Sequence, residues 1–172
     1  MKKIVLKLVI ASIAIIFLLL AGGIIVKALK STERADRIKK LPSFSIPTIE
    51  GNMFNSDDLP EGPLLIIYFH PECEHCRYEI SSLLENDIFS KVVMVLLVSN
   101  ASPESIKMFM RQFEFSDKDF RILTDSKLVF NEIFGIDIIP STLIYNKNLE
   151  LVKFQKGEVK MEAILKYLDS GN

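Results

Sequence analysis

The sequence has only two cysteines and two histidines among its 172 residues, and it contains no internal repeat or low-complexity tract. Both cysteines lie in one short segment, so no other cysteine is left to form a structural disulfide or to mispair in an oxidising compartment. His70 and His75 lie in the same segment, which leaves no distant histidine to complete a copper site. Structural zinc sites usually draw ligands from two separated clusters, and the sequence offers one. We therefore expect no metal centre.

Positive charge is scarce in the larger part of the chain. Residues 1–40 carry nine Lys and Arg against two acidic residues, whereas residues 41–172 carry twelve Lys and Arg against twenty Asp and Glu. An acidic globular part argues against nucleic acid as a partner. The basic run at 27–40 flanks an apolar segment and suits the anionic headgroups of a membrane.

One long hydrophobic run lies near the N-terminus. Residues 8–26 contain no charged side chain, and as a helix they would span about 28 Å, close to the thickness of a bilayer core. The apolar run continues well past Ala21-Gly22-Gly23, which favours an uncleaved anchor over a signal peptide. We expect a basic segment at 1–7, a transmembrane anchor at 8–26, a basic juxtamembrane linker at 27–40 and a globular domain at 41–172.

Two signals disagree about the side of the membrane on which the domain lies. Six basic residues follow the anchor and three precede it, which taken alone would place the domain in the cytoplasm. The isolated cysteine pair instead suits an oxidising compartment. We expect a single-pass protein of the cell membrane with its domain on the extracytoplasmic, periplasmic side.

The two cysteines form a C-x-x-C motif, Cys73-Glu74-His75-Cys76. The motif follows the apolar run Leu64–Phe69 and opens a segment with helical periodicity, an arrangement typical of redox proteins. Positions i and i+3 share one face of a helix, so the two sulfurs can close a disulfide. The first sulfur faces the unpaired N–H groups at the helix start, which favour the thiolate that attacks disulfides. The motif therefore predicts dithiol–disulfide exchange.

Hydrophobic periodicity predicts alternating strands and helices in the globular part. The predicted strands cover residues 44–49, a short stretch ending at 54, and residues 64–69, 92–98, 120–123, 142–145 and 149–154. The predicted helices cover residues 74–89, 102–113, 127–134 and 161–168. This order is a β-hairpin followed by βαβαβα and then ββα, an α/β arrangement with a central sheet flanked by helices.

Several residues beside the C-x-x-C motif add further evidence to the predicted order of elements. Tyr68-Phe69 ends the strand before the cysteines, Glu79 stands three residues after Cys76, and Ile139-Pro140 precedes the last pair of strands. With these features, residues 41–170 resemble the thioredoxin-like fold, specifically the TlpA/ResA-like branch of membrane-tethered thiol–disulfide oxidoreductases. The inserted strand and helix of that branch match residues 92–113.

The sequence departs from this family at two positions. Glu72 stands where a tryptophan usually precedes the first cysteine, and His75 replaces the common proline inside the motif. His75 as a donor or cation near the Cys73 sulfur would favour its thiolate, whereas negative charge on Glu72 and Glu74 would raise the pKa of the thiol. We therefore expect these three side chains to tune the pKa of Cys73 in opposite directions.

The resemblance implies a role for each remaining site residue. Cys73 is expected to be the exposed nucleophile and Cys76 the resolving thiol, with the Cys73–Cys76 disulfide as the redox group and no other cofactor. Glu79 is expected to accept the proton of Cys76, which requires a partly buried carboxyl with a raised pKa. The Ile139-Pro140 bond is expected to be cis, which leaves the Ile139 backbone free to pair with an extended substrate.

The expected function is thiol–disulfide exchange on exported proteins, with protein thiols and disulfides and an upstream redox donor as partners. Three alternatives remain. One is a thioredoxin-like accessory protein that handles copper or zinc, and another is a non-catalytic assembly module. The third is a peroxiredoxin-like peroxide reductase, although His70 occupies the position where such enzymes need a threonine.

Overall fold

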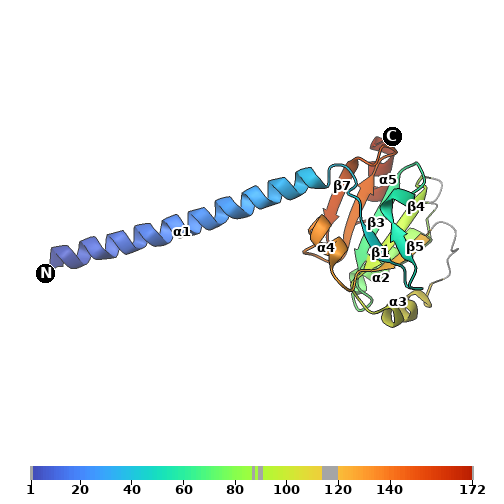
Figure 1. Cartoon of the computed structure of the whole chain (residues 1–172), viewed down its shortest axis with the longest axis horizontal. Helices are drawn as coiled ribbons and strands as arrows, with labels where there is room; N and C mark the ends of the chain where they lie inside the picture. The colour runs from blue at the N-terminus through green and yellow to red at the C-terminus, as the bar shows by residue number, and fades with distance from the viewer. Residues whose placement is uncertain (1, 87, 89–90, 114–119, 172) are drawn as a thin grey trace. The chain divides into compact units, whose positions relative to one another are not determined.

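The computed structural model describes residues 2–86, 88, 91–113 and 120–171, and the chain divides into two units at Arg37 and Ile38. The first unit is one long helix, α1 (Lys2–Arg37), coloured blue in Figure 1. Its stretch Ile15–Arg37 is long and apolar enough to cross a membrane, by length and composition. The predicted linker at 27–40 is thus helical as far as Arg37 and continuous with the predicted anchor.

The globular unit begins at Ile38, before the predicted boundary at residue 41. The Ile38 side chain is buried, and its carbonyl oxygen accepts a hydrogen bond from the Tyr145 hydroxyl at 3.1 Å. Lys40 forms an isolated β-bridge with Glu150. The prediction assigned residues 38–40 to the linker because Lys39 and Lys40 continue the basic run, although the backbone there pairs with the domain.

A five-stranded mixed sheet forms the centre of the globular unit, in the order β5-β4-β3-β6-β7 (Figure 1). The central strand β3 runs parallel to β4, which is parallel to β5, whereas β6 is antiparallel to β3 and β7 is antiparallel to β6. A separate hairpin, β1 paired with β2, precedes the sheet in sequence. The strands are β1 (Ser45–Pro47), β2 (Met53–Asn55), β3 (Leu64–Phe69), β4 (Met94–Ser99), β5 (Phe120–Thr124), β6 (Ser141–Tyr145) and β7 (Leu151–Lys156).

Among the residues that the structure describes, four helices flank this sheet, and the predicted order of elements is confirmed. They are α2 (Glu74–Leu84), α3 (Pro103–Met110), α4 (Val129–Phe134) and α5 (Met161–Ser170), and a short 3-10 turn, η1 (Ser56–Asp58), follows β2. α2 ends at Leu84, earlier than the predicted residue 89, and the buried Ile88 follows in a turn. The sequence analysis extended the helix because Ile88 fits the hydrophobic spacing of α2, although α2 itself ends at Leu84.

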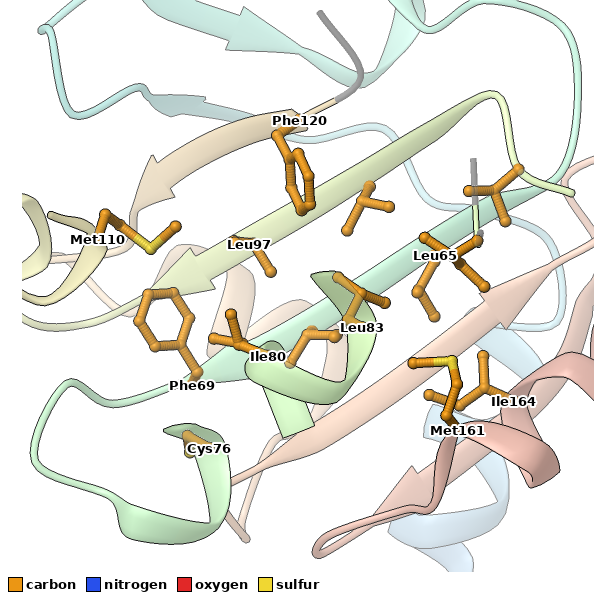
Figure 2. Packing of buried hydrophobic residues seen from close by; sticks show 14 of the residues in the cluster. Leu65, Phe69, Cys76, Ile80, Leu83, Leu97, Met110, Phe120, Met161 and Ile164 are labelled. Carbon is orange, nitrogen blue, oxygen red and sulfur yellow. The ribbon is translucent and has the colours of Figure 1, made fainter. Parts of the chain in front are cut away.

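The sheet is buried on both faces because β3 contributes side chains alternately to two apolar clusters. Leu65, Ile67 and Phe69 pack with residues of α2, α3 and α5, whereas Leu64, Ile66 and Tyr68 pack with residues of α4 and the hairpin. Figure 2 shows the first cluster, with Cys76 of α2 at the end nearest Phe69. The core therefore reaches the position where the cysteine motif begins.

Candidate active site

The cysteine motif lies where the central strand turns into a helix. β3 ends at Phe69, and Cys73 is the N-cap residue of α2 with an extended backbone (φ −88°, ψ 114°). The Cys73 N–H donates to the His70 carbonyl oxygen at 3.0 Å, and the Cys73 carbonyl oxygen accepts from the Arg77 N–H at 3.1 Å. A cap residue places its side chain over the unpaired N–H groups of the first turn. The sequence prediction of a sulfur at the helix start is thus met.

The two thiols differ in burial. The Cys76 N–H donates to the Cys73 sulfur at 3.3 Å, a hydrogen bond that favours negative charge on that sulfur. Cys73 is partly exposed and Cys76 is fully buried, and both are free thiols. Burial raises the pKa of Cys76, and the hydrogen bond with Cys73 and the nearby Glu79 carboxyl raise it further. Cys73 is therefore the accessible sulfur, and Cys76 keeps its proton until a base removes it.

Glu79 is a buried carboxyl one helical turn beyond Cys76, with a relative exposure of 1%. Its Oε1 accepts a hydrogen bond from the Thr142 hydroxyl at 2.5 Å, and its Oε2 accepts one from the Val159 N–H at 3.3 Å. Burial raises the pKa of Glu79 to about 7, against the lowering effect of the two hydrogen bonds. A carboxyl with this proton affinity gains and loses a proton near neutral pH. The burial and raised pKa expected of Glu79 are both present.

The turn before β6 contains a cis peptide bond between Ile139 and Pro140, as the sequence analysis expected. The register of the sheet pairs Ser141 with Tyr68, so this turn lies beside the end of β3 from which the motif emerges. The Pro140 carbonyl oxygen accepts from the Gly157 N–H at 2.8 Å, and the Ile139 side chain is half-buried against both apolar clusters. The pairing of the Ile139 backbone with a substrate stays a prediction.

Three polar residues lie beside the cysteines at the surface, since Glu72, Glu74 and His75 are all exposed. The His75 Nδ1 lies 2.5 Å from the Oε2 of Glu158, which comes from the segment between β7 and α5. Their effect on the Cys73 thiolate stays a prediction. Among side chains in the described part of the chain, no group of three or more His, Cys, Asp and Glu could hold a metal ion.

The sequence analysis missed three residues of this site, namely Thr142, Glu158 and Val159. Thr142 lies two positions after Pro140 in β6, and its hydroxyl is buried against Glu79. Val159 contributes only its backbone N–H. A threonine in a buried strand was the one available signal, because a buried hydroxyl needs a hydrogen-bond partner.

A dithiol at a helix start, a buried carboxyl below it and a cis-proline turn beside it, on a mixed α/β sheet, define a thioredoxin-like oxidoreductase of the thiol–disulfide class. The chain belongs to the AhpC/TSA family, whose model matches residues 38–154. The thioredoxin-like fold class and the resemblance to the TlpA/ResA-like branch are both confirmed by the comparisons that follow.

Two relatives and one solved structure illustrate these similarities. The thiol-disulfide oxidoreductase ResA of Bacillus thuringiensis is 21% identical over 141 residues, which cover 79% of each chain. A protein described as a bcp peroxiredoxin of Coxiella burnetii is 30% identical over 104 residues, covering 57% of this chain and 65% of the relative. A secreted disulfide oxidoreductase of Mycobacterium tuberculosis superposes with a TM-score of 0.64 at 16% identity, covering 78% of this chain and 98% of that structure.

Proposed function

We propose that this protein exchanges thiols and disulfides with exported proteins through Cys73 and Cys76. The observation that carries the proposal is the asymmetry of the pair. Cys73 is accessible and accepts the Cys76 N–H, while Cys76 is buried next to a carboxyl that titrates near neutrality. A first attack therefore belongs to Cys73 and a second, internal attack to Cys76.

The exchange proceeds in two displacements. The Cys73 thiolate attacks one sulfur of a client disulfide, forming a mixed disulfide while the other client sulfur leaves as a thiolate that takes up a proton. Cys76 then passes its proton to the Glu79 carboxylate and attacks the Cys73 sulfur. The Cys73–Cys76 disulfide forms and the client leaves as a dithiol, so two electrons have moved to the client. An upstream dithiol donor restores the reduced pair, and the same steps in reverse oxidise a client.

The turn at Ile139 and Pro140 provides the surface on which the client would lie. It borders the end of β3, and the Ile139 side chain is only half-buried. An extended peptide that pairs with the Ile139 backbone would present its disulfide to Cys73 at the neighbouring helix start. Main-chain pairing is tolerant of client sequence, which suits an enzyme that acts on several exported proteins.

The place of action proposed for the domain is the extracytoplasmic face of the cell membrane, with α1 as a single-pass anchor. α1 has the length and composition of a membrane span. Two cysteines, both in the motif, suit an oxidising compartment. The similar Mycobacterium tuberculosis protein is described as secreted, which agrees with this location.

Single-cysteine variants of the full chain in detergent, with insulin as the disulfide client, test the proposal. Cys73→Ser should abolish reduction of insulin, because no accessible thiolate remains. Cys76→Ser should also stop turnover but should accumulate a mixed disulfide with insulin, visible on non-reducing gels and released by dithiothreitol. In the reduced wild-type protein, iodoacetamide should modify Cys73 first; faster modification of Cys76 would reverse the two roles.

A peroxide reductase is the second candidate, favoured by the similarity to the Coxiella burnetii relative. Such an enzyme attacks a peroxide with its first cysteine and needs no exchange with a client protein. Hydrogen peroxide offered to the same preparations separates the two functions. Oxidation of Cys73 by peroxide that outpaces its reaction with insulin by a hundredfold would favour the peroxide reductase.

A further inference from the structure

Glu158 connects the two sides of the dithiol site. Its Oε2 lies 2.5 Å from Nδ1 of His75, inside the motif, although the two residues are 83 positions apart in the sequence. The Glu158 side chain is about one-third exposed, with a relative exposure of 34%. The next residue, Val159, donates its N–H to Oε2 of the buried Glu79 at 3.3 Å. One short segment between β7 and α5 thus touches the exposed and the buried side of the motif.

The charge of Glu158 acts on Glu79 in a definite direction. A negative charge near a carboxyl disfavours its ionisation, so Glu158 raises the pKa of Glu79. Cys76 faces Glu79 from α2, and β6 presents the neutral Thr142 hydroxyl. The core-facing positions of α5, which packs against α2, are apolar: Met161, Ile164 and Leu168.

His75 modifies this effect through Glu158. A protonated imidazole beside a carboxylate offsets part of its negative charge at a third site. His75 would thereby weaken the influence of Glu158 on Glu79. In this arrangement a protonated His75 would act on Glu79 through Glu158, without a contact between His75 and Glu79.

We propose that Glu158 is a positioning residue of the dithiol site, and that the His75–Glu158 pair sets how readily Glu79 takes up a proton. This inference rests on the proposed function, in which Glu79 accepts the proton of Cys76. According to this inference, His75 affects the second displacement, in which Glu79 takes the proton of Cys76, in addition to any effect on the Cys73 thiolate. A motif with a proline in place of His75 lacks this link, because proline has no side-chain donor.

An infrared titration of the full chain in lipid nanodiscs tests the proposal without turnover. The carboxyl band of Glu79 is identified by its loss in Glu79→Gln, and its midpoint is followed with pH. Glu158→Gln should shift the midpoint down because a negative charge is removed. His75→Gln should shift it up because the charge of Glu158 is no longer offset, and the double variant should behave like Glu158→Gln. Glu162→Gln, which removes an exposed charge from the first turn of α5, should leave the midpoint unchanged.

If the His75–Glu158 pair only held the segment between β7 and α5 in place, the variants would shift the Glu79 midpoint in a different way. If breaking the pair only released the segment, both single variants would lose the Val159 hydrogen bond and both would shift the midpoint up, since that bond lowers the pKa of Glu79. Shifts in the same direction, or a Glu158→Gln shift without an opposite His75→Gln shift, overturn the proposal. Because the titration needs no client, the result stands apart from the insulin assay, whose failure in the wild type would count against the proposed function alone.

Discussion

At the scale of single residues, Glu79 has the environment of a proton acceptor rather than of a structural ion. Its oxygens receive one hydroxyl and one backbone N–H, and no cation among the described residues forms an ion pair with it. A buried carboxylate without a cation is costly, so the carboxyl holds its proton up to a pH of about 7. The neighbouring Cys76 thiol needs a base when it becomes the attacking group.

Glu79→Gln should therefore slow the second displacement by about a hundredfold, the usual contribution of a positioned general base. The mixed disulfide with insulin should persist in this variant, and rapid-quench samples on non-reducing gels measure its lifetime. Glu85→Gln is the matched control, because Glu85 lies at the end of the same helix and is exposed. Equal lifetimes of the mixed disulfide in Glu79→Gln and Glu85→Gln would show that Glu79 is not the proton acceptor.

At the scale of elements, the buried Asp125, which directly follows β5, forms hydrogen bonds to both β3 and α4 beside the second apolar cluster. Its carboxylate accepts from the Tyr68 hydroxyl of β3 at 3.1 Å and from the N–H groups of Phe130 and Asn131 in α4, both at 2.9 Å. These N–H groups lie in the first turn of α4, where a carboxylate is stabilised by unpaired donors. α4 is thereby fixed to the strand that carries the motif.

Asp125→Ala should destabilise the fold by about 3 kcal/mol, because two buried donors and one partly buried donor lose their carboxylate acceptor. Tyr68→Phe removes only one of these hydrogen bonds and should cost about 1 to 2 kcal/mol. Urea unfolding of the full chain in detergent, followed by circular dichroism, compares the two. An Asp125→Ala variant no less stable than Tyr68→Phe would show that the two backbone donors find water instead.

At the scale of the whole molecule, a long N-terminal helix is followed by a single α/β domain. The basic flank after the apolar stretch of α1 and the lone cysteine pair give opposite indications of orientation. If α1 spans a membrane, its orientation decides in which redox compartment Cys73 and Cys76 lie.

Fusion of alkaline phosphatase after Asn172 should give an active enzyme, because this reporter folds only where its disulfides can form. Activity on intact cells is the measurement, and immunoblotting reports the amount of fusion protein. A β-galactosidase fusion at the same position serves as the reciprocal control. An alkaline phosphatase fusion that is inactive at normal abundance would place the domain in the cytoplasm.

The proton on Glu79 also makes the stability of the whole domain depend on pH. The Glu79 pKa is about 7 in the folded chain against the ordinary value of 4.5 for a glutamate in the unfolded chain, so between these values the folded protein binds a proton that the unfolded chain has released. The free energy of unfolding should therefore fall as pH rises from 4.5 to 7, by about 3 kcal/mol, and stay lower above that range. Urea unfolding at pH 5 and pH 8 measures the difference, and Glu79→Gln should show less of it. If Glu79→Gln showed the same difference in the free energy of unfolding between pH 5 and pH 8, the pH dependence would come from other titratable groups.

The local sequence was sufficient to predict the order of elements and the position of Cys73 at a helix start, because strand and helix periodicity depend on residues only a few positions apart. The cis bond before Pro140 was expected from the resemblance to the thioredoxin-like fold. The errors lie at boundaries, where this local information ends. Residues 38–40 were taken as linker because Lys39 and Lys40 extend the basic run, and the helix after the motif was extended past Leu84 because the hydrophobic pattern continues to Ile88.

The sequence by itself determined that a dithiol would sit after the end of a buried strand and that Glu79 would follow it by one helical turn. Only the tertiary structure decided what surrounds these groups. Glu79 meets Thr142 and Val159 across 63 and 80 positions, and His75 meets Glu158 across 83. No periodicity links residues so far apart, because their contacts depend on how β6 and the segment before α5 pack against α2. The dithiol is thus a property of the local chain, and the proton affinity of its carboxyl is a property of the fold.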